Sequence, residues 1–162
     1  KHIPGLITLA IALAAQLGIE PEETVQAVAQ LEPVPHRLEL IEGNGVLIID
    51  DAYNSNIEGA INALGILKEI DRYKVIITPG LVELGSEEAE MNEKLGAEIG
   101  RVCDSAIFVG PLAEVLKKGA MSVGMDANCV FCTPDLYTAV AILRQLPKDN
   151  VVLFENDLPD NY

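Results

Sequence analysis

Short apolar runs rich in β-branched residues alternate with amphipathic stretches from Gly43 onward. Each apolar run has the length of a strand, and each amphipathic stretch has the length of a helix. Connections of this length between strands imply right-handed β-α-β units in one sheet. The sequence therefore predicts an α/β fold: a Rossmann-like, mainly parallel sheet with helices on both faces. The predicted strands lie near 46–50, 74–78, 104–109, 128–132 and 150–154, and the helices near 57–70, 86–101, 111–122 and 134–146.

Two further helices, near 6–17 and 22–31, are predicted to form a hairpin before this alternation begins. The first has an apolar run from Ile7 to Leu17, which is shorter than the roughly 20 residues that span a bilayer. This run predicts a buried helix rather than a membrane segment. Two prolines then interrupt the chain at 33 and 35, so the segment 32–37 is the best candidate for a domain boundary.

The formal charge of −14 excludes the function classes that need clustered cations. Nucleic acid and anionic membranes are therefore not expected as partners. Three cysteines with no framework of paired spacings favour a reducing, cytoplasmic compartment. Cys129 and Cys132 form a C-x-x-C pair, but in a strand side chains three residues apart point to opposite faces, which argues against a metal or redox site.

The run Val46–Ile49 predicts a parallel strand covered on both faces, and it ends in Asp50 and Asp51. Ligands of open α/β sheets bind at the carboxyl ends of such strands. Ser55 or Asn56 is placed to cap the following helix. An equally good interpretation is that the two aspartates only end the strand and that Asn54 makes a turn.

Two other segments carry candidate site residues. Glu83 lies in the loop 78–85 after the second parallel strand, at the sheet edge expected for Asp51, although it could simply solvate or cap that loop. Arg37 follows the prolines of the linker and could bind an anion through two parallel hydrogen bonds. A surface arginine without a partner is the ordinary alternative.

With these residues in view, the chain resembles the carboxyl-terminal part of the Mur ligase family over nearly its whole length. The segment Asp50-Asp-Ala-Tyr-Asn-Ser-Asn56 is similar to a signature of that family. The segments 35–39 and 82–85 resemble its arginine motif and the loop after the second strand. Within the family, the likeness is greatest to ligases that add D-alanyl-D-alanine to a UDP-muramoyl tripeptide.

The resemblance implies an ATP-dependent amide ligase of peptidoglycan precursor synthesis in the cytoplasm, in which a carboxylate is activated as an acyl phosphate and then attacked by an amine. Residues 1–40 would be the tail of a central domain that holds the P-loop and Mg²⁺, and 41–162 the last domain, which closes over ATP. The substrates would be a UDP-muramoyl peptide and an amino acid or D-alanyl-D-alanine. The implied ATP-binding residues are Arg37 for phosphate, Asp51 for the ribose hydroxyls, and Tyr53 and Asn54 for the shape of the pocket, with Glu83 on the substrate-side loop.

The resemblance implies no catalytic residue or metal ligand within this chain, so the fragment alone is expected to be inactive. Residues 2–6, which include Ile3 and Leu6, and residues 155–160 differ from the family pattern, as does Ile57. The adenine contact and the acceptor therefore stay open. The alternative function is a non-catalytic α/β nucleotide-binding or interaction module, in which Asp50 and Asp51 are structural or hold a cation.

Overall fold

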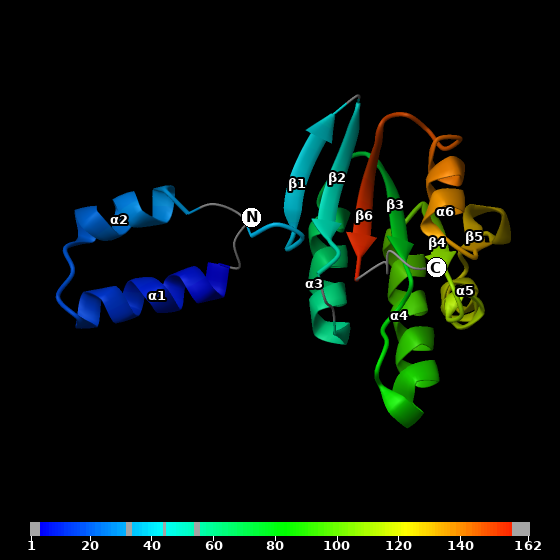
Figure 1. The fold of residues 1–162 in the computed structure, drawn as a ribbon, viewed down its shortest axis with the longest axis horizontal. Helices are drawn as coiled ribbons and strands as arrows, with labels where there is room; N and C mark the ends of the chain where they lie inside the picture. The colour runs from blue at the N-terminus through cyan, green and yellow to red at the C-terminus, as the bar shows by residue number, and fades with distance from the viewer. Residues whose placement is uncertain (1–3, 32–33, 44, 54–55, 157–162) are drawn as a thin grey trace.

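The computed structural model describes residues 4–31, 34–43, 45–53 and 56–156. They contain a six-stranded sheet of order β1-β2-β6-β3-β4-β5 (Figure 1). The predicted α/β fold with a mainly parallel sheet is confirmed, because every pairing from β2 to β5 is parallel. The strands are β1 (Glu39–Gly43), β2 (Val46–Asp51), β3 (Tyr73–Thr78), β4 (Ser105–Val109), β5 (Val130–Thr133) and β6 (Asn150–Glu155).

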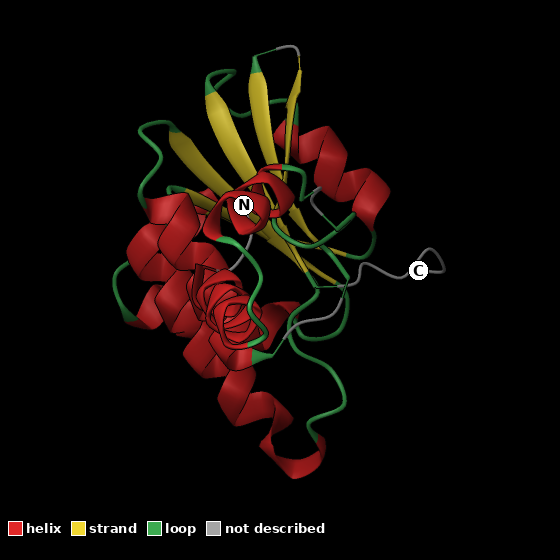
Figure 2. Cartoon of the chain, turned by 90° about the vertical axis from the view of Figure 1, so that its left-hand side faces the viewer, coloured by secondary structure: helices red, strands yellow, loops and turns green. Residues whose placement is uncertain are grey.

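Helices cover both faces of the sheet, as the sequence predicts (Figure 2). Three of them, α3, α4 and α5, bury their apolar side chains against one face, in a core that includes Leu64, Leu95 and Leu116. On the other face α6 packs Ala139 against Val75 and Ile107. These helices are α3 (Ile57–Lys68), α4 (Glu88–Val102), α5 (Ala113–Ser122) and α6 (Leu136–Leu143), with short 3₁₀ turns η1 (Gly85–Glu87) and η2 (Ala127–Cys129).

The edge strand β1 is not among the strands that the sequence predicts. It pairs antiparallel with β2, in a register that sets Glu39 opposite Asp50 and Gly43 opposite Val46. Because the two strands run in opposite directions, the start of β1 lies at the carboxyl end of β2. The linker that precedes β1 is thereby brought to the edge of the sheet where ligands are expected.

The predicted hairpin is present as α1 (Pro4–Gln16) and α2 (Pro21–Ala29), and it extends away from the sheet domain (Figure 1). The prediction that the first helix is buried is wrong for the described chain: Leu9 is 58% exposed and Leu13 56% exposed. The physical reason is that α1 packs mainly on α2, which covers only part of a helix that is apolar all round. No helix among the described residues is long and apolar enough to cross a membrane.

Two smaller expectations need correction. In β2 only Ile49 is fully buried, and Val46 to Ile48 are half-buried. Val46 lies on the face where α6 packs mainly on β4 and β5, whereas Leu47 packs at the margin of the core under α3. Cys129 lies in η2 rather than in the strand, since β5 begins one residue later. Cys103, Cys129 and Cys132 are free thiols in the described chain.

Candidate functional site

Polar side chains converge at the carboxyl end of β2. The two oxygens of Asp50 accept from the backbone N–H of Ala52 at 3.2 Å and contact Nδ1 of His36 at 2.9 Å. Oδ1 of Asp51 accepts from the backbone N–H of Leu38 at 3.1 Å. Both aspartates therefore lie at the end of β2 and bind the linker through His36 and Leu38. Within the described part of the chain, no hydrogen bond is seen at Oδ2 of Asp51.

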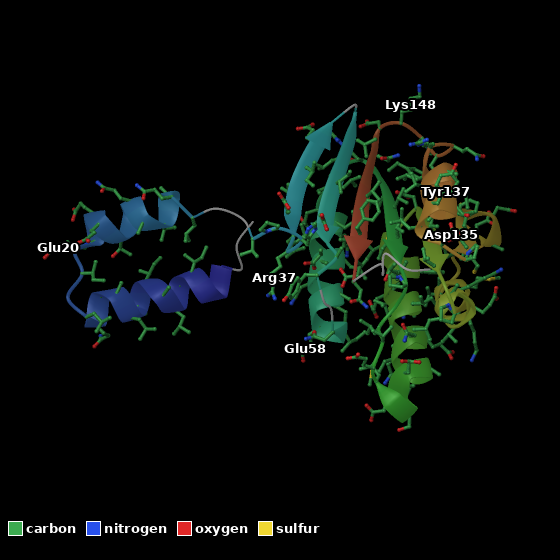
Figure 3. The ribbon with its side chains drawn as sticks, viewed as in Figure 1. Glu20, Arg37, Glu58, Asp135, Tyr137 and Lys148 are labelled. Atoms are coloured by element: carbon green, nitrogen blue, oxygen red, sulfur yellow. The ribbon has the colours of Figure 1, made fainter. Side chains whose placement is uncertain are left out.

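The linker gives Arg37 a partner. Its guanidinium carbon lies 4.5 Å from the centroid of the Tyr53 ring, a distance at which a cation is attracted to an aromatic face. The backbone N–H of Tyr53 also donates to the carbonyl of His36 at 3.2 Å, so the two segments are joined beside the stacked pair. Figure 3 shows Arg37 at the edge of the sheet domain nearest to the hairpin. Since Tyr53 is 60% exposed, the pair forms an accessible cationic surface.

An unusual backbone conformation produces this arrangement. His36 and Leu38, on either side of Arg37, have positive φ angles of 60° and 51°. Such values are uncommon for residues other than glycine and indicate that surrounding contacts fix the chain. The contacts of Asp50 with His36 and of Asp51 with Leu38 are those that fix it here.

The electrostatic state of Asp51 reflects its position. Burial raises the pKa of its carboxyl group above the ordinary value, and the neighbouring charge of Asp50 raises it further. The hydrogen bond from Leu38 and the charge of Arg37 act in the opposite direction and lower the pKa. Burial is the largest effect, so the ionised form of Asp51 is held at some cost in free energy.

The helix after this site begins as expected. Oδ1 of Asn56 accepts from the backbone N–H of Gly59 at 2.8 Å, so Asn56 caps α3. Ser55, the other predicted cap, and Asn54, a predicted site residue, lie outside the described residues.

Glu83 lies on the loop that follows β3. It is exposed, with φ of 64°, and among the described contacts it forms no cap on η1 or α4. The base of the loop is buried, since Leu81 exchanges two hydrogen bonds of 2.8 Å with the side chain of Asn92. The structure thus brings Arg37, Asp51 and Tyr53 together and leaves Glu83 on a separate loop at the same sheet edge.

Three residues of this edge were not singled out from the sequence as partners of the site. His36 and Leu38 hold Asp50 and Asp51, and Asn156, which follows β6, links the end of β2 to the loop after β3. Glu155 is fully buried at the end of β6, and residues 157–162 lie outside the described chain. Only the proximity of His36 and Leu38 to the arginine was visible in the sequence, because their contacts depend on the unpredicted strand β1.

Comparison with known proteins identifies the class of protein. The sequence profile of the family "Mur ligase, glutamate ligase domain" matches residues 36–155, which is most of the chain. The chain therefore belongs to the Mur ligase family, and this membership favours the ligase hypothesis over an unrelated binding module.

Individual relatives agree with this assignment. The chain is 31% identical over 159 residues to a UDP-N-acetylmuramoyl-tripeptide--D-alanyl-D-alanine ligase of Bacillus subtilis, covering 96% of this chain and 35% of that protein. It is 26% identical over 153 residues to a UDP-N-acetylmuramoylalanine--D-glutamate ligase of Prochlorococcus marinus, covering 94% of this chain and 30% of that protein. The chain thus spans about a third of the length of these relatives.

Solved structures share the fold. A crystal structure of MurF from Acinetobacter baumannii superimposes with a TM-score of 0.81 and 24% identity, over 94% of this chain and 34% of that one. The MurF ligase of Thermotoga maritima in complex with ADP gives a TM-score of 0.68 and 24% identity, over 91% of this chain and 33% of that one.

Proposed function

We propose that this chain is the closing domain of an ATP-dependent amide ligase of peptidoglycan precursor synthesis. The observation that carries the proposal is the antiparallel strand β1, which brings Arg37 beside Tyr53 and Asp51 at the carboxyl edge of the sheet. A cation, an exposed aromatic ring and a partly buried carboxylate are the groups that a nucleotide with phosphates, base and ribose requires.

Each side chain has a proposed role. Arg37 would bind an ATP phosphate, because its planar guanidinium can donate two parallel hydrogen bonds while the Tyr53 ring supports it from one side. Asp51 would accept from the ribose hydroxyls through Oδ2, since Oδ1 is engaged by Leu38. Asn54 would complete the pocket. ATP supplies the activating phosphoryl group: a carboxylate oxygen takes up the γ-phosphoryl as ADP leaves, and an amine then displaces phosphate.

The proposed Mg²⁺ site lies outside this chain. Among the described residues there is no group of three or more histidine, cysteine, aspartate or glutamate side chains that could hold a metal ion. Mg²⁺ would therefore be bound by the part of the ligase that lies outside this chain, and the chain alone would not catalyse. The reaction would take place in the cytoplasm, where ATP is available.

We further propose that residues 1–40 are the tail of a central domain and 41–162 the last domain. Apolar side chains exposed on the hairpin, such as Leu13, would then be covered by the preceding part of the longer protein. A Leu13→Cys variant should react with a thiol reagent in the 162-residue chain and be protected in the longer protein. A Tyr137→Cys variant is the control, because Tyr137 is 86% exposed on α6 and should react in both.

The acceptor is proposed from the relatives' activities. The Bacillus subtilis relative is a UDP-N-acetylmuramoyl-tripeptide--D-alanyl-D-alanine ligase, so the proposed substrates are a UDP-muramoyl tripeptide and D-alanyl-D-alanine. The Prochlorococcus marinus relative is a D-glutamate ligase, which makes UDP-N-acetylmuramoylalanine and D-glutamate the second pair to test. Glu83 is exposed on the loop after β3, where it could meet the incoming amine.

The test is ATP-dependent phosphate release by the longer protein with each substrate pair. Release that requires one acceptor establishes the ligase and identifies that acceptor. Arg37→Ala should lower kcat/KM by roughly 100-fold, the usual effect of removing a preorganised charge donor. Arg101→Ala is the matched control, because Arg101 is an exposed arginine that pairs with Glu98 on α4. No release from folded protein with either pair and Mg²⁺ would contradict the proposal.

A further inference from the structure

Asn156 connects the carboxyl ends of β2 and β6 with the loop after β3. It directly follows β6, the strand that lies between β2 and β3 in the sheet. Its backbone N–H donates to the carbonyl of Asp51 at 3.2 Å, and its side-chain Nδ2 donates to the carbonyl of Gly80 at 2.5 Å. Only 2% of Asn156 is exposed, so these bonds are shielded from water. One residue thus connects the nucleotide side of the site with the loop that carries Glu83.

The identity of this residue fits the position. Asn156 has φ of 67°, a left-handed conformation that asparagine and glycine adopt at lower cost than other residues. Glycine would satisfy the backbone but has no amide to donate. Aspartate would keep the shape of the side chain but would place an acceptor opposite the Gly80 carbonyl. Asparagine alone among these three combines the backbone conformation with the hydrogen bond to Gly80.

The loop that Asn156 contacts has a rigid base and an exposed tip. The backbone N–H of Gly80, a residue with φ of 88°, donates to Oγ1 of Thr78 at 3.0 Å, and Leu81 is held by Asn92. Val82 and Glu83 follow at once and are exposed. Movement of the base would therefore displace the tip directly.

We propose that Asn156 is a positioning residue that fixes the loop 79–84, and with it Glu83, relative to Asp51. The expected effect on the acceptor rests on the proposed function. The expected effect on the position of the loop rests on the hydrogen bonds alone. The backbone bond to Asp51 survives any change of side chain, whereas the bond to Gly80 does not. Loss of the side-chain amide should therefore affect the acceptor and spare ATP.

The experiment compares Asn156→Asp with Asn150→Asp in the longer ligase. Asn150 is the matched control because it is also 2% exposed, lies at the other end of β6, and also donates Nδ2 to a backbone carbonyl, that of Pro147, at 2.6 Å. Asn156→Asp should raise the KM for D-alanyl-D-alanine, or for D-glutamate if that acceptor supports turnover, by roughly 10-fold, the scale expected for a lost buried hydrogen bond. The KM for ATP should change by less than about 2-fold, and Asn150→Asp should change neither constant.

Hydrogen exchange of peptides that span the loop gives a readout independent of activity. Asn156→Asp should speed exchange there by roughly 10-fold relative to the wild type and to Asn150→Asp. If Asn156→Asp does not fold, Asn156→Gly replaces it, because glycine keeps the backbone conformation and lacks the amide. Unchanged exchange and unchanged KM for the acceptor would overturn the inference. A wild-type protein without ligase activity would instead overturn the proposed function, while the exchange result would still decide the role of Asn156.

Discussion

The backbone N–H of Leu38 donates to Oδ1 of Asp51 at 3.1 Å and so ties the linker to the end of β2. This bond sets the position of Arg37, the residue before Leu38. It also occupies one of the two carboxylate oxygens of Asp51, the residue that we propose binds the ribose hydroxyls. The arrangement joins a structural contact and a proposed binding contact on one half-buried side chain.

Asp51→Asn should stabilise the protein at neutral pH. Burial of the charged carboxyl is the largest cause of its raised pKa, and an asparagine oxygen can still accept from Leu38. The gain in free energy of unfolding should be less than about 1 kcal/mol, because solvent screens a half-exposed charge. Nucleotide binding should weaken at the same time, since the amide is a poorer acceptor for ribose hydroxyls. Denaturant unfolding and ADP titration of the longer protein would measure the two effects.

The stability difference between Asp51→Asn and the wild type should depend on pH with a definite sign. The pKa of Asp51 in the folded state lies above its ordinary value of 3.8, so the folded state binds the proton more tightly. The contribution of wild-type Asp51 to the free energy of unfolding is therefore most favourable below pH 3.8. It is lost as the pH rises through the raised pKa of the folded state. The advantage of the variant should grow from pH 3.5 to 7. An advantage that shrinks over this range would contradict the assignment of burial as the main cause.

Gly119→Ala should destabilise the protein by roughly 2–3 kcal/mol, as overpacked sites do. Gly119 of α5 lies against the Glu93 carbonyl of α4, and a Cβ would overlap that oxygen. Gly65→Ala on α3 is the matched control, because its Cβ would meet nothing within 4 Å. That variant should be more stable by about 0.5–1 kcal/mol, because alanine is the better helix former. Thermal unfolding of both variants checks the sign of each change.

Asn56→Ala should cost about 1 kcal/mol through loss of the cap on α3. Asp135→Ala removes a similar cap, where Oδ1 accepts from the backbone N–H of Thr138 at 2.7 Å at the start of α6, and should also lower the melting temperature. Only the Asn56 variant should weaken ADP binding, because α3 begins beside Tyr53 and Asp51 while α6 lies on the other face. Equal loss of binding in both variants would show a general effect of instability.

The three thiols should react with iodoacetamide in a fixed order in the native protein. Cys132 is exposed, Cys129 is half-buried, and Cys103 is buried, with a pKa that desolvation raises. Burial and the neighbouring Glu114 also raise the pKa of Cys132, so its labelling rate should still climb about 10-fold per pH unit up to pH 9. Peptide mass spectrometry at several times would follow each site. Labelling of Cys103 as fast as Cys132 without denaturant would contradict the fold.

The local sequence pattern was sufficient to predict most of the strands and helices of this protein. The apolar runs ending at Asp51 and Thr78 and the amphipathic stretches after them specify strands and helices, because periodicity and capping act over a few neighbouring residues. The family signature that begins at Asp50 likewise lies in one continuous segment, so it could be identified from the sequence alone. The cap at Asn56 was predicted for the same reason.

Tertiary structure decided how the candidate site is assembled. The sequence of β1 has only a weak strand pattern. Its residues Leu40, Ile41 and Glu42 are exposed at the sheet edge, and the strand is held by its pairing with β2. That pairing brings Arg37 to Tyr53. The insertion of β6 between β2 and β3 likewise brings Asn156 to Gly80, 76 residues away in the chain. Contacts between residues this distant in the chain depend on the free energy of the whole sheet. A local sequence pattern carries no information about that free energy. The exposure of α1 follows the same reasoning, since a helix's sequence shows that it needs an apolar partner but not where that partner lies.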